Sequence, residues 1–185
     1  MIQLHTERFL ISDLTLDDFT EHHTLLSDER VMRYLQDIKT SSISESKENL
    51  IKAVEESLSS NRKLYFLKIE DKNSKEFIGE IGYTVIEETP FGKMVHLGYF
   101  IKEKYWGKGY TTEALQRIIE FAFCENNVYR ISTGCVKENA GSEKVMQKCG
   151  FTKEGELKEH TFHEGKLKDR VIYHLLKSEF ARQRV

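Results

Sequence analysis

Apolar residues recur along much of the chain at the spacing of a helix. Between residues 44 and 58, Leu50, Ile51, Val54 and Leu58 fall on one face and predict an amphipathic helix over Ser44–Leu58. A second such face predicts a helix over Thr111–Cys124, with Ala114, Leu115, Ile118, Ile119 and Ala122 turned inward. Cap residues and shorter apolar patterns predict three more helical segments, from Thr15 to about Leu26, over Asp28–Tyr34 and over Ser142–Lys148.

Other apolar and β-branched runs are too short for helices and predict seven strands. These are Phe9–Leu14, Leu64–Glu70, Phe77–Glu87, Lys93–Lys102, Tyr129–Val136, Phe151–Phe162 and Lys168–Lys177. Short polar turns join the second, third and fourth strands into an antiparallel meander, and Glu164–Gly165 closes a final hairpin. Helices interleaved with such a sheet imply a layered α/β fold with a mixed, mostly antiparallel, seven-stranded sheet. The length of 185 residues predicts one domain spanning residues 1–185.

Charge and hydropathy restrict the possible partners. The formal net charge is −2, which argues against general nucleic-acid binding because that function needs a basic surface. No apolar run approaches the length of a membrane span, so no membrane partner is expected. Residues Met1–Leu10 include His5, Glu7 and Arg8 where a signal peptide would be apolar. A cytoplasmic location is therefore expected.

The cysteine pattern favours free thiols. Cys124, Cys135 and Cys149 are an odd number without a C-x-x-C pair, and each lies among apolar neighbours. We expect all three to be buried thiols rather than disulfides or zinc ligands, and we expect no metal.

The segment Lys102–Glu113 carries the most specific signal. It reads Lys-Glu-Lys-Tyr-Trp-Gly-Lys-Gly-Tyr-Thr-Thr-Glu and leads from a predicted strand through two glycines into a predicted helix. Unpaired N–H groups at a helix N-terminus attract anions, and glycines allow the backbone to approach them closely. The pattern is not a P-loop, and Thr112 occupies the third glycine position of the dinucleotide motif. An ordinary tight turn is the alternative, but the strand–loop–helix context favours a diphosphate site with a rim of Lys102, Lys104 and Lys108.

This loop resembles the acetyl-coenzyme A loop of the GCN5-related N-acetyltransferases (GNAT), and particularly the ribosomal-protein-alanine (RimJ/RimL-like) branch. Lys104, Gly107 and Gly109 align with the signature Gln/Arg-x-x-Gly-x-Gly/Ala, although Lys104 replaces Gln or Arg. Downstream, Asn139, Ser142 and the run Lys148-Cys-Gly-Phe151 match the branch in the same order. Leu4–Asp18 and Asp169–Phe180 resemble its two ends, so the resemblance spans nearly the whole chain.

The resemblance implies the GNAT fold, with acetyl-coenzyme A as cosubstrate and an amine as acceptor. The fourth and fifth strands, Met94–Lys102 and Tyr129–Val136, would splay apart. Backbone groups near Phe100, Ile101 and Lys102 would pair with the pantetheine, and an N–H near Tyr99 or Phe100 would polarise the thioester carbonyl. Asn139 would cap its helix and face the pantetheine, and Ser142 would face the sulfur. The diphosphate loop would comprise Lys104, Trp106, Gly107, Lys108, Gly109, Tyr110, Thr111 and Thr112.

Proton transfer is less well specified. Many members of the superfamily have a Tyr acid seven residues after the Asn, but that position is Met146 here, and the branch suggests Ser142 instead. Direct transfer in a ternary complex requires no enzyme nucleophile. Candidates for the general base are Glu80 and His96, because both alternate with residues that could face the acceptor. An exposed strand carboxylate is the alternative for Glu80. Further options for the base are Glu159, His160 and His163.

The acceptor also remains open. A protein N-terminal α-amine or a small amine is expected, and the alternatives are a polyamine, hinted at by Glu87 and Glu88, or an amine antibiotic. A non-catalytic acyl-coenzyme A sensor would also fit the glycine loop. Loops around Tyr34–Ser46 and Glu87–Lys93 are expected to shape the acceptor site. The oligomeric state is open, with a homodimer among the options.

Overall fold

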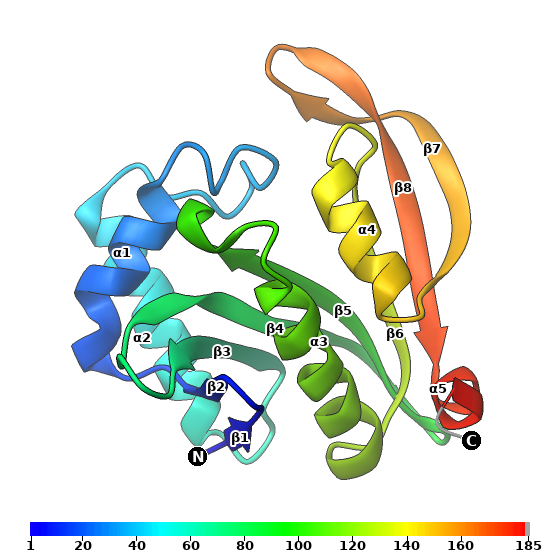
Figure 1. Cartoon of the computed structure of the whole chain (residues 1–185), viewed down its shortest axis with the longest axis horizontal. Helices are drawn as coiled ribbons and strands as arrows, with labels where there is room; N and C mark the ends of the chain where they lie inside the picture. Colours follow the sequence, from blue (N-terminus) through cyan, green and yellow to red (C-terminus); the bar gives the residue numbers. More distant parts are fainter. Residues whose placement is uncertain (184–185) are drawn as a thin grey trace.

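Within residues 1–183, the sheet contains eight strands in the order β1-β2-β3-β4-β5-β6-β8-β7 (Figure 1). This computed structural model describes residues 1–183. In this described part of the chain, β5 and β6 are parallel, and every other neighbouring pair of strands is antiparallel. The predicted α/β class with a mixed, mostly antiparallel sheet is confirmed. The strands are β1 (Gln3–His5), β2 (Phe9–Asp13), β3 (Leu64–Asp71), β4 (Phe77–Thr89), β5 (Gly92–Ile101), β6 (Val128–Val136), β7 (Thr152–His163) and β8 (Lys166–Leu176).

The strand missing from the prediction is β1, so the count of seven was one short. β1 has three residues and pairs through Gln3–His5 with the end of β2. A run of three residues is too short to show alternation, and its pairing with β2 makes it a strand.

Two apolar cores lie on opposite faces of the sheet. One contains buried residues from α1 (Phe19–Ser27) and α2 (Ile43–Leu58) together with Phe77 and Phe100. The larger core contains buried residues of α3 (Tyr110–Glu120) and α4 (Ala140–Lys148). A short α5 (Lys177–Gln183), absent from the prediction, follows β8.

Local sequence signals account for several helix ends. Thr15 forms a reciprocal capping box with Asp18 ahead of α1, and Ser42 forms one with Glu45 at the start of α2. In contrast, the helix expected at Asp28–Tyr34 is a series of turns within the 28–42 connection. Asp28 Oδ1 accepts hydrogen bonds from the N–H groups of residues 30 and 31, which satisfies them without a helix.

β5 and β6 are the fourth and fifth predicted strands, and they diverge as expected (Figure 1). Their pairing runs only from Lys93 opposite Val128 to His96 opposite Ser132. Beyond this point β5 stays paired with β4 as far as Ile101, and β6 stays paired with β8 as far as Val136. Each strand therefore follows a different neighbour, and the backbone edges that face each other from Leu97 onward have no strand partner there.

Candidate active site

The glycine loop presents its backbone at the N-terminus of α3. Gly107 and Gly109 adopt left-handed φ angles of 72° and 75°, and Gly109 is the N-cap of the helix. The N–H groups of the first turn, Tyr110–Thr112, have no acceptor within the helix. A Cβ placed on Gly107 would meet no atom within 4 Å. The loop therefore offers several donors and the positive end of a helix dipole to an anion.

The three lysines beside this loop differ in whether they are paired with a carboxylate. Lys102 forms an ion pair with Glu21, and Lys104 forms one with Glu76. The cationic rim expected of Lys102, Lys104 and Lys108 is thus largely neutralised by these carboxylates. Within residues 1–183, Lys108 has no ion pair and is the lysine best able to meet a phosphate.

Arg8, which the sequence did not suggest, fastens the loop from the turn between β1 and β2. Its Nη1 donates to the carbonyl of Lys108 at 3.3 Å, and its Nε donates to Glu113 Oε2 at 2.6 Å. The guanidinium carbon lies 4.3 Å from the centre of the Tyr110 ring. Arg8 and its partners are separated by about a hundred residues in the sequence. No local sequence pattern predicts these contacts.

The backbone of β5 divides its polar groups between its two neighbours. Lys102 N donates to Ile78 O at 2.9 Å, so the N–H groups of Lys102 and Phe100 point toward β4. Those of Tyr99 and Ile101 point toward the diverging β6. Trp106 Nε1 donates to the Ile101 carbonyl at 3.0 Å, which holds the indole against this edge.

At the start of α4, three polar side chains come together. Asn139 Oδ1 accepts a hydrogen bond from Ser142 N at 3.1 Å, which confirms the predicted cap. Tyr99 Oη lies 2.9 Å from Ser142 Oγ and also donates to the Ser142 carbonyl at 3.1 Å. Burial raises the pKa of Tyr99, so its hydroxyl stays protonated. Tyr99 was not expected as a side chain at the site, because its partner lies on a helix that follows the next strand.

Residues 8–152 match the family model described as the acetyltransferase (GNAT) domain. The chain belongs to the GNAT acetyltransferase family. It is 28% identical over 181 residues to the uncharacterized N-acetyltransferase p20 of Bacillus licheniformis, covering 98% of this chain and 99% of the relative. The family and its named relatives make the chain an N-acetyltransferase, an enzyme that transfers acetyl groups to amines.

Two solved structures of this GNAT fold are similar over almost their whole length. The ribosomal-protein-S5-alanine acetyltransferase of Vibrio fischeri has a TM-score of 0.81 at 23% identity, covering 96% of this chain and 97% of that one. The spermidine N-acetyltransferase of Vibrio cholerae, solved with CoA and spermine, has a TM-score of 0.81 at 22% identity, covering 94% and 98%. At these identities the likeness establishes the fold of the acetyltransferase.

Glu80 of this GNAT chain is neither an exposed carboxylate nor open to the divergence. It is 2% exposed, and its Oε1 lies 2.6 Å from Nδ1 of His22, which is 1% exposed on α1. Strand alternation places Glu80 on the face covered by α1 and α2, opposite Phe100 of β5. The sequence analysis expected Glu80 either to face the cleft as a base or to be exposed to solvent. Both expectations were wrong, because Glu80 is buried against His22.

His96 of the acetyltransferase lies at the last paired position of β5 and β6. It is exposed, on the same face of β5 as Phe100. Partial loss of hydration and the nearby Arg170 guanidinium lower the pKa of His96 below 6.5, while Asp37 acts in the opposite direction. The imidazole is consequently neutral, and able to accept a proton, at neutral pH.

The remaining base candidates lie on the β7–β8 hairpin of the GNAT chain. His163 is buried, with its ring centre 5.3 Å from that of Tyr34, and Glu164 pairs with Arg33 at 3.1 Å. These contacts join the hairpin tip to the 28–42 connection. Glu159 and His160 are exposed in an irregular part of β7, where the register with β8 shifts.

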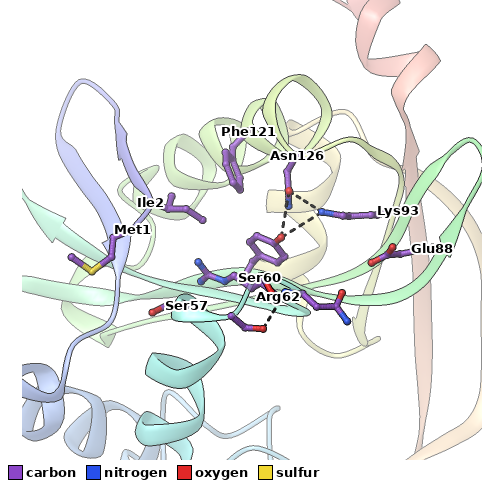
Figure 2. Close-up of a pocket in the computed structure, with 12 residues that line it drawn as sticks. Met1, Ile2, Ser57, Ser60, Arg62, Glu88, Lys93, Phe121 and Asn126 are labelled. Atoms are coloured by element: carbon purple, nitrogen blue, oxygen red, sulfur yellow. Dashed lines mark hydrogen bonds between the residues drawn. The ribbon is translucent and has the colours of Figure 1, made fainter.

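An open cleft of about 510 Å³ lies elsewhere on the acetyltransferase (Figure 2). It is lined by the N-terminus, the end of α2 and the start of β5, where Lys93 Nζ donates to Asn126 Oδ1 at 2.9 Å. The Glu87–Lys93 turn reaches this cleft at the paired end of β5 and β6. It therefore lies away from the divergence, and its role in shaping the acceptor site stays a prediction.

Two of the three cysteines in this GNAT chain are buried thiols. Burial raises the pKa values of Cys135 and Cys149 to about 11 and about 12. Cys124 is exposed, so the expectation that all three are buried was wrong for this residue. Residues 1–183 contain no group of three or more His, Cys, Asp or Glu side chains placed to bind a metal ion. Over the same residues, no helix is both long and apolar enough to span a bilayer.

Proposed function

We propose that the chain transfers the acetyl group of acetyl-coenzyme A directly to a primary amine in a ternary complex, as one domain acting in the cytoplasm. The observation that carries this proposal is the position of the glycine loop. Gly107 and Gly109 open the N-terminus of α3 next to the edge where β5 and β6 have separated. The helix N-terminus would bind the diphosphate, and the open strand edge would bind the extended pantetheine arm, so the two must lie side by side.

The cosubstrate would be held mainly by main-chain donors. The diphosphate would lie on the amides of residues 107–112, with Lys108 as the free cation. The pantetheine would follow the edge of β5 through Tyr99 and Ile101, whose polar groups face β6, and Asn139 would lie across from it. The V. cholerae relative solved with CoA supports this cosubstrate, and relatives acting on ribosomal proteins support the cytoplasmic location.

Each step of the transfer has a residue suited to it. The lone pair of the neutral amine attacks the thioester carbonyl, whose oxygen would accept a hydrogen bond from Tyr99 N–H. The new C–N bond forms as the C–S bond breaks, and the amine gives its proton to His96 or to water. The thiolate leaves toward Ser142 and is protonated through the Tyr99–Ser142 pair, whose oxygens are 2.9 Å apart.

The state of the amine decides how strong a base is needed. An α-amine has a pKa near 8, and a lysine amine near ~10.4, so the former is partly neutral at cell pH. His96, with its lowered pKa, is a base of modest strength. A protein N-terminus or a small amine of low basicity therefore suits the site better than a lysine side chain.

Calorimetric titration with coenzyme A tests the loop. Gly107→Glu would place a carboxylate where the diphosphate binds, and we expect no measurable binding. Gly165→Glu is a matched control, because Gly165 also has a left-handed φ of 75° and no atom within 4 Å of an added Cβ, compared with 72° for Gly107. If Gly107→Glu binds coenzyme A as well as Gly165→Glu does, the proposed diphosphate site at the glycine loop would be refuted.

Thiol release over a panel of amines and peptides separates an enzyme from an acyl-coenzyme A sensor. The Tyr99–Ser142 hydrogen bond favours the enzyme, because a sensor has no need of a proton donor beside the sulfur. We expect release that depends on the added amine. Binding of coenzyme A without release from any acceptor would favour the sensor.

A further inference from the structure

Arg170 lies on β8, and its side chain contacts the backbone of the neighbouring strand β6. Its Nη2 donates to the Gly134 carbonyl at 3.1 Å, although Arg170 itself pairs with Val136 in the sheet. A Cβ on Gly134 would lie 3.5 Å from Arg170 Nε. Because Gly134 has no side chain, the Arg170 side chain can lie directly over the backbone of β6 at this position.

This guanidinium has no counter-ion within the described chain. Over residues 1–183, Arg170 is in no ion pair, whereas the arginines at positions 8, 30, 33, 62, 117 and 130 each contact a carboxylate. The nearby acids Glu138, Glu156 and Asp169 are already paired with lysines. The hydrogen bond to the Gly134 carbonyl uses one N–H donor of this half-buried guanidinium, and its charge has no carboxylate beside it. The remaining donors and the charge are therefore available to an external anion.

Arg170 lies close to the proposed base. Arg170 is paired with Val136 and His96 with Ser132, so strand alternation places both side chains on the same face of the sheet. The charge of Arg170 lowers the pKa of His96, and the charge of Asp37 raises it. Asp37 is exposed on the 28–42 connection and, within residues 1–183, forms no ion pair. His96 thus experiences the charges of a guanidinium and a carboxylate that form no ion pair within residues 1–183.

We propose that Arg170 binds a carboxylate of the acceptor, which is therefore an amine whose own molecule also carries a carboxylate. This inference rests on the proposed function and deepens it. The planar guanidinium suits two parallel hydrogen bonds to a carboxylate. Asp37 attracts the ammonium form, which loses one proton to solvent to become the neutral amine. His96 then takes the second proton, which the attacking nitrogen releases as the C–N bond forms and the C–S bond breaks. A polyamine has no group for Arg170 and is repelled by it.

Two kinds of molecule have this chemistry, a free amino acid and a peptide with an acidic residue near its N-terminus. Thiol release is measured with free amino acids against their amides, and with peptides carrying Asp or Glu against Asn or Gln near the N-terminus. Whichever pair shows the preference for the carboxylate identifies the source. Spermidine serves as the acceptor without a carboxylate.

Arg170→Gln is the decisive variant. We expect its KM for the preferred carboxylate acceptor to rise about 10-fold to 100-fold, because a hydrogen-bonded charge pair is lost. We expect its kcat, and its kcat/KM for the matched amide, to change less than about threefold. Arg170→Lys should recover part of the loss. Arg182→Gln, which removes an exposed arginine of α5, is the control for net charge.

The outcomes separate the two proposals. Equal use of carboxylate and amide acceptors by the wild type and Arg170→Gln would overturn the role of Arg170 and leave acetyl transfer intact. If Arg170→Gln lowers kcat/KM equally for the carboxylate acceptor and for its amide, with unchanged coenzyme A binding, the role of Arg170 would also be overturned. No release from any acceptor, despite coenzyme A binding, would overturn acetyl transfer itself and the inference with it.

Discussion

Arg8 Nε lies 2.6 Å from Oε2 of Glu113, which joins the turn between β1 and β2 to the first turn of α3. The backbone N–H of Arg8 also donates to Glu113 Oε1 at 2.9 Å. Although burial acts to raise the pKa of Glu113, hydrogen bonds from Thr6 and Arg8 hold it below its usual value. Glu113 is thus a carboxylate close to the proposed diphosphate site, and Arg8 neutralises it.

Arg8→Ala should weaken coenzyme A binding. Glu113 would keep its negative charge without its partner, and the Lys108 carbonyl would lose a donor, so the loop would be both less ordered and less attractive to phosphates. We expect the dissociation constant to rise about tenfold, which corresponds to ~1.4 kcal/mol. Calorimetry measures it, with Arg117→Ala as the control because Arg117 pairs with Glu125 at the far end of α3. Equal affinities of the two variants would argue against Arg8 as a support of the loop.

Tyr99→Phe should slow the chemical step. The variant keeps the ring but removes the hydroxyl that lies 2.9 Å from Ser142 Oγ, so the leaving thiolate loses its path to a proton. We expect kcat to fall about 100-fold or more, within the range for loss of acid catalysis, while coenzyme A affinity is retained. Ser142→Ala should have the same effect, and the double variant should be no slower than either single one. Loss of coenzyme A binding in either variant would instead assign the pair to binding.

The pH dependence of kcat/KM should identify His96 as the base. Because the pKa of His96 lies below 6.5, activity should persist at neutral pH and decline as the pH falls through that lowered value. Because burial raises the pKa of Tyr99 above 10.0, loss of its proton should not reduce activity as the pH rises toward that value. An acceptor amine of pKa near 8 adds a second ionisation on the acid side. His96→Gln should remove the first ionisation, and an unaltered profile in that variant would exclude His96.

Glu80→Ala should destabilise the fold rather than alter the reaction. The substitution leaves His22 buried without the carboxylate that lies 2.6 Å from its Nδ1. We expect the free energy of unfolding to fall by about 3–5 kcal/mol, as when one partner of a buried pair is removed. Urea denaturation measures it, and Glu87→Ala, an exposed carboxylate on the same strand, should change it by less than ~0.5 kcal/mol. Glu80→Gln should remain active, and a specific loss of kcat in this variant would restore Glu80 as a base.

Gly134→Ala should destabilise the sheet where β6 meets β8. A Cβ at this position would lie 2.5 Å from the Val171 carbonyl, so the strands must move apart. We expect a loss of about 1–3 kcal/mol, the usual cost of overpacking. Gly155→Ala is the matched control, because its Cβ would lie 3.9 Å from the side chain of Ile172 at ordinary contact distance. Similar unfolding midpoints for the two variants would contradict this role of Gly134.

The sequence alone determined those features that depend on near neighbours. Helix and strand periods, the caps at Thr15 and Asn139, and the left-handed terminator at Gly150, with φ of 81°, follow from interactions within a few residues. The glycine loop before α3 belongs to the same class, because its donors come from one turn of backbone. The family resemblance added the divergence of β5 and β6, which the pairing of the strands confirms.

Only the tertiary structure decided which distant side chains meet. Glu80 has the same alternation in the sequence whether it faces solvent or His22, and only the packing of α1 on that face buries it. Arg8, Tyr99 and Arg170 find their partners through strand register and helix placement, at separations where local pattern carries no information. A one-residue shift of register would turn Tyr99 and Arg170 to the other face, so their contacts depend on the whole sheet.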